Sequence, residues 1–135
     1  MEKLKQKHDI LLQALSTLQE AVASMQKTNH DDPNYSAWRD SIIKRFEYCS
    51  DLFWKYLKLI LEKKHGVMVA SPRFTYREAA TAQIITEQES SVLLRMLDDR
   101  NQTSHVYRAV FAEELAGIIP NYYDLMYLLA QRITP

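Results

Sequence analysis

The chain has 135 residues, of which 47% are hydrophobic and 25% charged, with two glycines and one cysteine. This length suits one compact domain, residues 1–135, that buries roughly two-thirds of its unfolded surface. Two isolated glycines exclude Gly-rich dinucleotide and phosphate-binding loops, and one cysteine excludes an internal disulfide. The 17 basic and 17 acidic residues balance to zero net charge. Since general nucleic-acid coaters are visibly basic, any RNA contact must be a local site.

The first predicted element is a long amphipathic helix near the N-terminus. Apolar residues recur at alternating spacings of four and three from Leu4 to Met25, with His8 in one slot. This spacing gives one apolar stripe along about six helical turns. The most apolar stretch of the chain, residues 52–61, contains two lysines and is too short to span a bilayer. We therefore expect a cytoplasmic protein with no membrane partner.

A second long helix is predicted after the turn-forming segment 29–34. It begins near residues 36–38 and ends at residues 63–66, where cations suit the negative end of the helix dipole and glycine suits the cap. Its apolar positions widen to two sides, which predicts a central helix. Two helices of similar length joined by a short polar turn predict an antiparallel hairpin.

Two capping signals predict the next helices. Ser71 followed by Pro72 is typical of an N-cap and first helical position, and that short helix should run to about Ala82. Thr86 and Glu89 have the spacing of a capping box, which opens a further helix.

The last helical stretch covers about residues 108–132. Gly117 and Pro120 lie inside it, so we expect a kink or a break there. Taken together, the elements predict an all-α protein, an up-and-down antiparallel four-helix bundle with an extra short helix.

The sequence gives little support for a metal site or for a nucleophilic cysteine. The four histidines are scattered, and the paired acids are adjacent residues, which point about 100° apart on a helix. We therefore expect no metal and no cofactor. Cys49 falls on the apolar stripe of the second helix, which favours a buried core residue over a reactive thiol. The aromatic residues of the same helix suit either a base-stacking surface or, more commonly, the core; they are Trp38, Phe46, Tyr48, Phe53, Trp54 and Tyr56.

The polar segment 98–107 follows an apolar run and allows two interpretations. It is either a helix end with a surface loop, or a phosphodiester site in which Arg100 binds phosphate and His105 transfers protons. Residues five apart on a regular helix diverge by about 140°. The two side chains therefore converge only if the helix deforms within residues 101–104, or if each meets its copy across a two-fold axis.

Residues 100–107 resemble the Arg-x4-His-x-Tyr signature of HEPN proteins. More narrowly, the chain resembles the nucleotidyltransferase substrate-binding protein family, the small helical partner of a minimal nucleotidyltransferase. Further similarity lies in segments 45–58 and 71–73, so the resemblance extends over about residues 38–129. Three blocks in the same order make it more specific than the short signature alone.

The resemblance implies a homodimeric bundle that binds a minimal nucleotidyltransferase encoded nearby. Related HEPN toxins are metal-independent ribonucleases, in which an arginine and a histidine from two protomers line one cleft. Carried over to this chain, Arg100 would bind phosphate, His105 would be the general acid and base, and Tyr107 would receive AMP from the partner enzyme. The supporting positions implied by the resemblance are Asn101, Glu47 and Arg45.

The leading hypothesis is therefore the helical subunit of a HEPN and nucleotidyltransferase module, acting as a binding partner or as a ribonuclease toxin. RNA, and not DNA, is the expected nucleic acid. The alternative is a non-catalytic dimerisation or scaffold protein in which Arg100 and His105 are only a helix-end pair.

Overall fold

The computed structural model describes residues 2–135, and this part of the chain is helical throughout apart from its connecting loops. The helices are α1 (Glu2–Gln26), α2 (Tyr35–His65), α3 (Pro72–Thr81), α4 (Glu87–Asn101) and α5 (Ala109–Arg132), with a one-turn 3-10 helix, η1 (Thr103–His105), between the last two. Four long helices and the short α3 confirm the predicted all-α class. Within residues 2–135, no helix has the length and apolar character that crossing a membrane requires.

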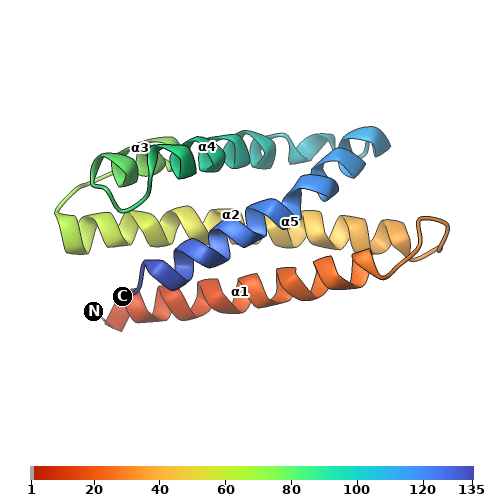
Figure 1. The fold of residues 1–135 in the computed structure, drawn as a ribbon, viewed down its shortest axis with the longest axis horizontal. Helices are drawn as coiled ribbons and strands as arrows, with labels where there is room; N and C mark the ends of the chain where they lie inside the picture. The colour runs from red at the N-terminus through yellow and green to blue at the C-terminus, as the bar shows by residue number, and fades with distance from the viewer. Residues whose placement is uncertain (1) are drawn as a thin grey trace.

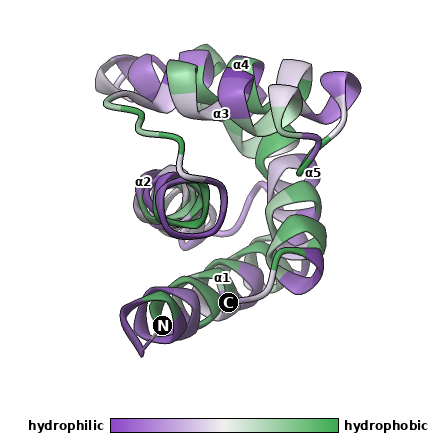
Figure 2. Cartoon of the chain, turned by 90° about the vertical axis from the view of Figure 1, so that its left-hand side faces the viewer, coloured by the Kyte–Doolittle hydropathy of each residue, from purple (hydrophilic) through white to green (hydrophobic). Residues whose placement is uncertain are grey.

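Helix α2 lies at the centre of the bundle, and the other helices pack against it. Helices α1 and α2 make the predicted antiparallel hairpin, α3 and α4 form a layer on the far side of α2, and α5 crosses diagonally against α1 and α2 (Figure 1). Seen from one end, α5 lies on one side of α2, and the opposite side of α2 carries no covering helix of the described chain (Figure 2).

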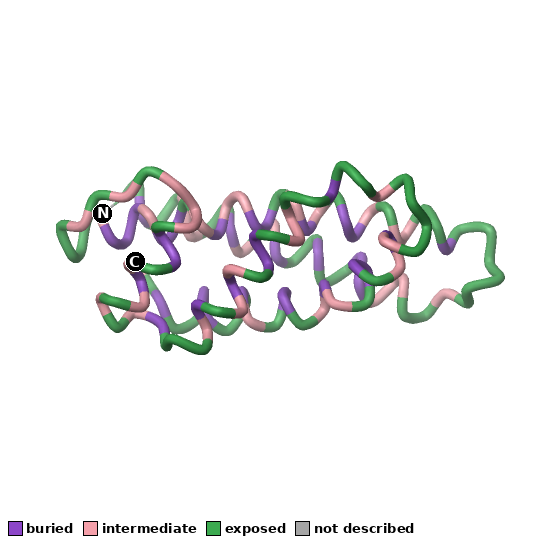
Figure 3. Tube along the Cα trace, turned by 90° about the horizontal axis from the view of Figure 1, so that it is seen from above, coloured by how far each residue is buried: buried purple, intermediate pink, exposed green. Residues whose placement is uncertain are grey.

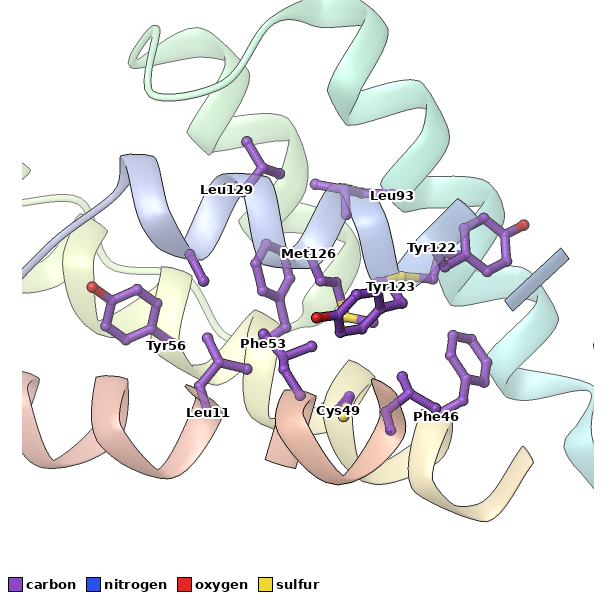
Figure 4. Close-up of a cluster of buried hydrophobic side chains, with 14 of the residues drawn as sticks. Leu11, Phe46, Cys49, Phe53, Tyr56, Leu93, Tyr122, Tyr123, Met126 and Leu129 are labelled. Carbon is purple, nitrogen blue, oxygen red and sulfur yellow. The ribbon is translucent and has the colours of Figure 1, made fainter. Parts of the chain in front are cut away.

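Hydrophobic spacing explains why α2 is central. Helix α1 buries a single stripe that includes Leu11 and Leu15, whereas α2 buries residues facing α1, α3 and α5 (Figure 3). Cys49 is fully buried in this core beside Phe46 and Phe53, as predicted (Figure 4). Of the six aromatic residues singled out from the sequence of this helix, only Tyr48 is mostly exposed, and Trp38 and Trp54 are half-buried.

The predicted helix ends are confirmed by their caps. Gly66 follows α2 with φ of 67°, a left-handed conformation that glycine adopts without steric cost. The Ser71 hydroxyl accepts a hydrogen bond from the backbone N–H of Phe74 at 3.3 Å. At the start of α4, Thr86 and Glu89 exchange both hydrogen bonds of a capping box.

Of the kink or break expected at Gly117 and Pro120, the break is wrong, because α5 runs without interruption from Ala109 to Arg132. A proline removes one backbone hydrogen bond and crowds the preceding turn. Helix α5 buries side chains on both sides of this point, including Leu115 and Tyr122, so tertiary packing holds the two halves in one helix.

Candidate functional site

The helix deforms where the Arg100 and His105 side chains would otherwise diverge. Helix α4 ends at Asn101, and the chain continues through the 3-10 turn η1 before α5 begins. The Thr103 hydroxyl donates to the backbone oxygen of Arg100 at 3.0 Å, and the Thr103 side chain is buried. This local hydrogen bond competes with continuation of the helix, which explains the tight turn at this position.

Arg100 is fixed against α2 by a forked ion pair with Asp51. Its Nε donates to Asp51 Oδ1 at 3.0 Å, and its Nη2 donates to Oδ2 at 3.1 Å. Nη1 makes a longer bond of 3.4 Å to the Thr103 hydroxyl. The hydrogen bond to Asp51 is the main reason that the pKa of Arg100 lies above its usual value. Two parallel bonds of this kind define orientation as well as charge pairing.

This pairing leaves donors free. A guanidinium has five N–H groups. Asp51 accepts from two of them and Thr103 from a third. One hydrogen on Nη1 and one on Nη2 therefore remain for a further acceptor, although the Asp51 carboxylate compensates the charge of Arg100. Sequence reasoning missed Asp51, because spacing alone does not show which acid of α2 faces α4.

His105 and Tyr107 lie on the exposed connection between α4 and α5. Their ring centroids are 6.3 Å apart, and the ring centroids of His105 and Phe111 are 6.4 Å apart with the two rings nearly perpendicular. Tyr107 is 78% exposed, the most exposed large hydrophobic side chain of the described residues. Both the Tyr107 phenol and the His105 imidazole are therefore exposed to solvent.

Within one chain the two predicted catalytic groups make different contacts. Arg100 is turned toward α2 and bonded to Asp51, whereas His105 stands in the loop beside Tyr107 and Phe111. Both come from the same end of α4.

The predicted supporting residues differ in their positions. Glu47 lies one turn before Asp51 on α2, and its charge also raises the pKa of Arg100, though less than Asp51 does. Asn101 is exposed at the end of α4. Arg45 instead donates from Nη1 to the backbone oxygen of Thr17 at 2.6 Å, so it joins α2 to α1.

A second contact fixes the end of α4 to α5. The Tyr122 hydroxyl donates to Asp99 Oδ2 at 2.5 Å. The pKa of Tyr122 is raised, mainly because the phenol is buried and secondly because of this hydrogen bond to the carboxylate. Beside it lies a pocket of about 250 Å³ lined by Asp99, Phe111, Glu114, Leu115 and Ile118. The loop that carries His105 and Tyr107 is thus attached at both ends to well-packed helices.

Residues 2–135 contain no group of three or more histidine, cysteine or acidic side chains placed to hold a metal ion. The candidate site itself offers a guanidinium, an imidazole and a phenol, from Arg100, His105 and Tyr107. These groups suit binding of phosphate and transfer of protons.

Comparison with known proteins gives both a family and a fold. The family model for "Nucleotidyltransferase substrate binding protein like" matches residues 6–134. A crystal structure of a Thermus thermophilus protein is 33% identical, with a TM-score of 0.79, covering 90% of this chain and 97% of that one. A search among curated proteins finds no match.

Two more distant structures share the fold. A toxin–antitoxin structure named MntA-HpeT is 17% identical with a TM-score of 0.70, covering 92% of this chain and 96% of that one. A tri-AMPylated Shewanella oneidensis HEPN toxin in complex with MNT antitoxin is also 17% identical, with a TM-score of 0.69 and the same coverage. The match over nearly the whole chain, on the same bundle, shows that this protein belongs to the family of nucleotidyltransferase substrate-binding proteins.

Proposed function

We propose that this chain is the helical subunit of a two-component module that binds a minimal nucleotidyltransferase, and that its homodimer is a metal-independent endoribonuclease. In this proposal AMP transfer to Tyr107 silences the ribonuclease. Family membership supports the nucleotidyltransferase partner. Two structures with the same fold, a toxin–antitoxin pair and an AMPylated toxin in complex with its antitoxin, support the finer functions.

The observation that carries the proposal is the placement of the three groups around the end of α4. Arg100 is held rigidly with two N–H groups free, and His105 and Tyr107 are exposed on the loop that follows directly. A fixed cation and an accessible imidazole are the two groups that metal-independent cleavage of a phosphodiester uses.

The reaction uses the RNA itself as nucleophile. His105 accepts the proton of the ribose 2′-hydroxyl as its oxygen attacks the adjacent phosphorus, and the bond from phosphorus to the 5′-oxygen breaks. The departing 5′-oxygen takes a proton from the His105 of the second protomer, which leaves a 2′,3′-cyclic phosphate and a 5′-hydroxyl. The free N–H groups of Arg100 donate to the phosphate oxygens as negative charge develops.

The ribonuclease is tested with the purified homodimer, a labelled RNA and an excess of EDTA. Cleavage should persist with the chelator and fall at least about 100-fold in His105→Ala, the usual contribution of a general acid or base. The matched control is His65→Ala, an exposed histidine at the end of α2. Equal residual cleavage in both variants would show that the ribonuclease is a contaminant.

The modification is tested by mixing the chain with its partner nucleotidyltransferase and ATP. Intact mass spectrometry should show an added AMP in the native chain and none in Tyr107→Phe. Tyr48→Phe is the control, because Tyr48 is also exposed but lies on α2. Unchanged AMP addition in Tyr107→Phe would place the modification elsewhere.

One observation favours the alternative, a non-catalytic scaffold. Both oxygens of Asp51 already engage Arg100, which is also how a purely structural ion pair is built. The scaffold predicts that Arg100→Ala weakens folding or dimerisation and that no RNA cleavage occurs in the native chain. The ribonuclease predicts loss of cleavage in a folded, dimeric Arg100→Lys variant, because lysine keeps the charge but not the fork.

A further inference from the structure

We propose that a lysine groove at the end of the bundle opposite the α4–α5 loop binds a single-stranded RNA segment, separately from Arg100 and His105. The groove lies between the start of α1 and the second half of α2, and its volume is about 240 Å³. We define the lysine groove by the residues that line it, which are Lys3, Lys7, Trp54, Lys55, Lys58, Leu59 and Glu62. The proposed function supplies the identity of the polymer as RNA.

Charge segregation is the first argument. Residues 2–10 and 55–65 contain seven of the 17 basic residues of the chain but only three of its 17 acidic residues. The antiparallel hairpin brings these two segments together at one end (Figure 1). A chain of zero net charge therefore presents a local cationic surface, which is the kind that attracts phosphate.

The state of the lysines is the second argument. Within residues 2–135, none of the four groove lysines forms an ion pair, whereas Arg39, Arg73, Arg100 and Arg132 all do. Unpaired lysines spread along two helices suit a chain of phosphates better than a single compact anion. A second copy of the same face is a poor occupant, because like charges would oppose each other.

Trp54 is the third argument. Its half-buried ring lines the groove, and the Nζ of Lys58 lies 6.0 Å from the ring centroid. An aromatic ring next to a cation can stack a base and bind the adjoining phosphate, and it accepts any base. The sequence alone left this base-stacking role open among the aromatic residues of the helix. The structure places five of the six elsewhere and leaves Trp54 in the groove.

The groove also connects to the candidate site along α2. Asp51, Lys55, Lys58 and Glu62 follow spacings of four, three and four, so they share one face of the helix. The rise from Asp51, which holds Arg100, to Lys55 is about 6 Å. An RNA strand in the lysine groove can thus continue toward Arg100 without crossing another helix.

The test measures binding apart from cleavage. In the His105→Ala background, fluorescence anisotropy follows a labelled 12-nucleotide oligouridylate across a salt series. Lys55→Gln with Lys58→Gln should reduce the slope of log K against log salt by about 1.4, or about 0.7 for each phosphate that is no longer neutralised. The matched control, Lys27→Gln with Arg77→Gln, removes the same charge from exposed positions outside the groove and should leave the slope unchanged.

Stacking is tested separately with Trp54 as the only tryptophan, in a Trp38→Phe variant. Added oligouridylate should quench its fluorescence, and Trp54→Leu should weaken binding about 5-fold or more. Equal slopes in the groove and control variants would overturn the proposal. So would groove substitutions that weaken binding of the partner enzyme or change the oligomeric state while RNA binding is unaffected. Because every readout is binding, a failure of the ribonuclease would leave these results intact.

Discussion

The ion pair between Arg100 and Asp51 gives the sharpest prediction about the candidate site. A double-mutant cycle with Asp51→Asn, Arg100→Gln and the combined variant isolates the coupling between the two side chains. Asparagine keeps the size of Asp51 and one accepting oxygen but removes the charge. Glutamine shortens Arg100 and removes its fork. The measured quantity is the free energy of unfolding of the four proteins.

The magnitude follows from geometry and exposure. The fork of 3.0 and 3.1 Å is near ideal, but the Arg100 side chain is 27% exposed and that of Asp51 is 44% exposed. Water therefore screens the pair, which excludes the several kcal/mol of a fully buried ion pair. We expect a coupling energy of about 1 kcal/mol, at the upper end of surface pairs. At this chain length it corresponds to about 4 °C in Tm.

The assay is urea unfolding followed by far-ultraviolet circular dichroism at low and at high salt. The coupling should shrink as salt rises, because partly exposed charges are screened. Arg73 and Asp98 form the control pair, with one bond of 2.7 Å and side chains 42% and 62% exposed, so their coupling should be smaller. A coupling for Arg100 and Asp51 within about 0.3 kcal/mol of zero would refute the claim that Asp51 fixes Arg100.

Three further predictions concern the bundle. Burial raises the pKa of the Cys49 thiol to about 12, so its labelling by a disulfide reagent at pH 8 should follow unfolding; rapid labelling of the native protein would contradict the structure. The hydrogen bond from Arg132 lowers the pKa of Glu89 in the folded protein. The ionised Glu89 therefore stabilises the fold at pH values above its unfolded-state pKa, and this stabilisation is lost as the pH falls through its folded-state pKa. In urea unfolding, Glu89→Gln should lower the free energy of unfolding by about 1 kcal/mol at pH 7 and leave it unchanged at pH 2. Tyr56→Phe removes the donor to the backbone oxygen of Ile133 and should cost about 1–2 kcal/mol in the same assay, whereas no loss would mean that water replaces the hydroxyl.

Local signals in the sequence predicted most of the fold. The four-three spacing of α1 and the Thr86–Glu89 capping box act over one or two turns, so they can be found without knowing the tertiary structure. The continuity of α5 could not be found in this way. Pro120 is a strong local signal for a break, and packing of the helix on both sides of it outweighs that signal.

The candidate site was predictable only in part, because it depends on how helices face one another. The sequence singled out Arg100 and His105 and allowed them to converge either by a deformation between them or across a two-fold axis; the structure contains a deformation, because α4 ends at Asn101 and the turn η1 follows. The choice of Asp51 as the partner of Arg100 depends on the rotation of α2 relative to α4, which residue spacing does not encode. The partner of Arg45 could not be predicted from the sequence either. Its hydrogen bond is to the backbone of α1, which residue spacing within α2 does not show.

The ion pair of Arg100 with Asp51 and the lysine groove together suggest which residues supply RNA affinity and which supply catalysis. A guanidinium compensated by a carboxylate attracts an ordinary phosphate weakly, so Arg100 alone is a poor source of RNA affinity. Its two free N–H groups are nevertheless fixed in direction, and fixed donors act most strongly where negative charge increases during reaction. If the unpaired lysines supply affinity and Arg100 supplies stabilisation of the transition state, binding and cleavage are carried by different residues. Substitutions in the groove would then raise KM, whereas Asp51→Asn, which loosens Arg100, would lower kcat.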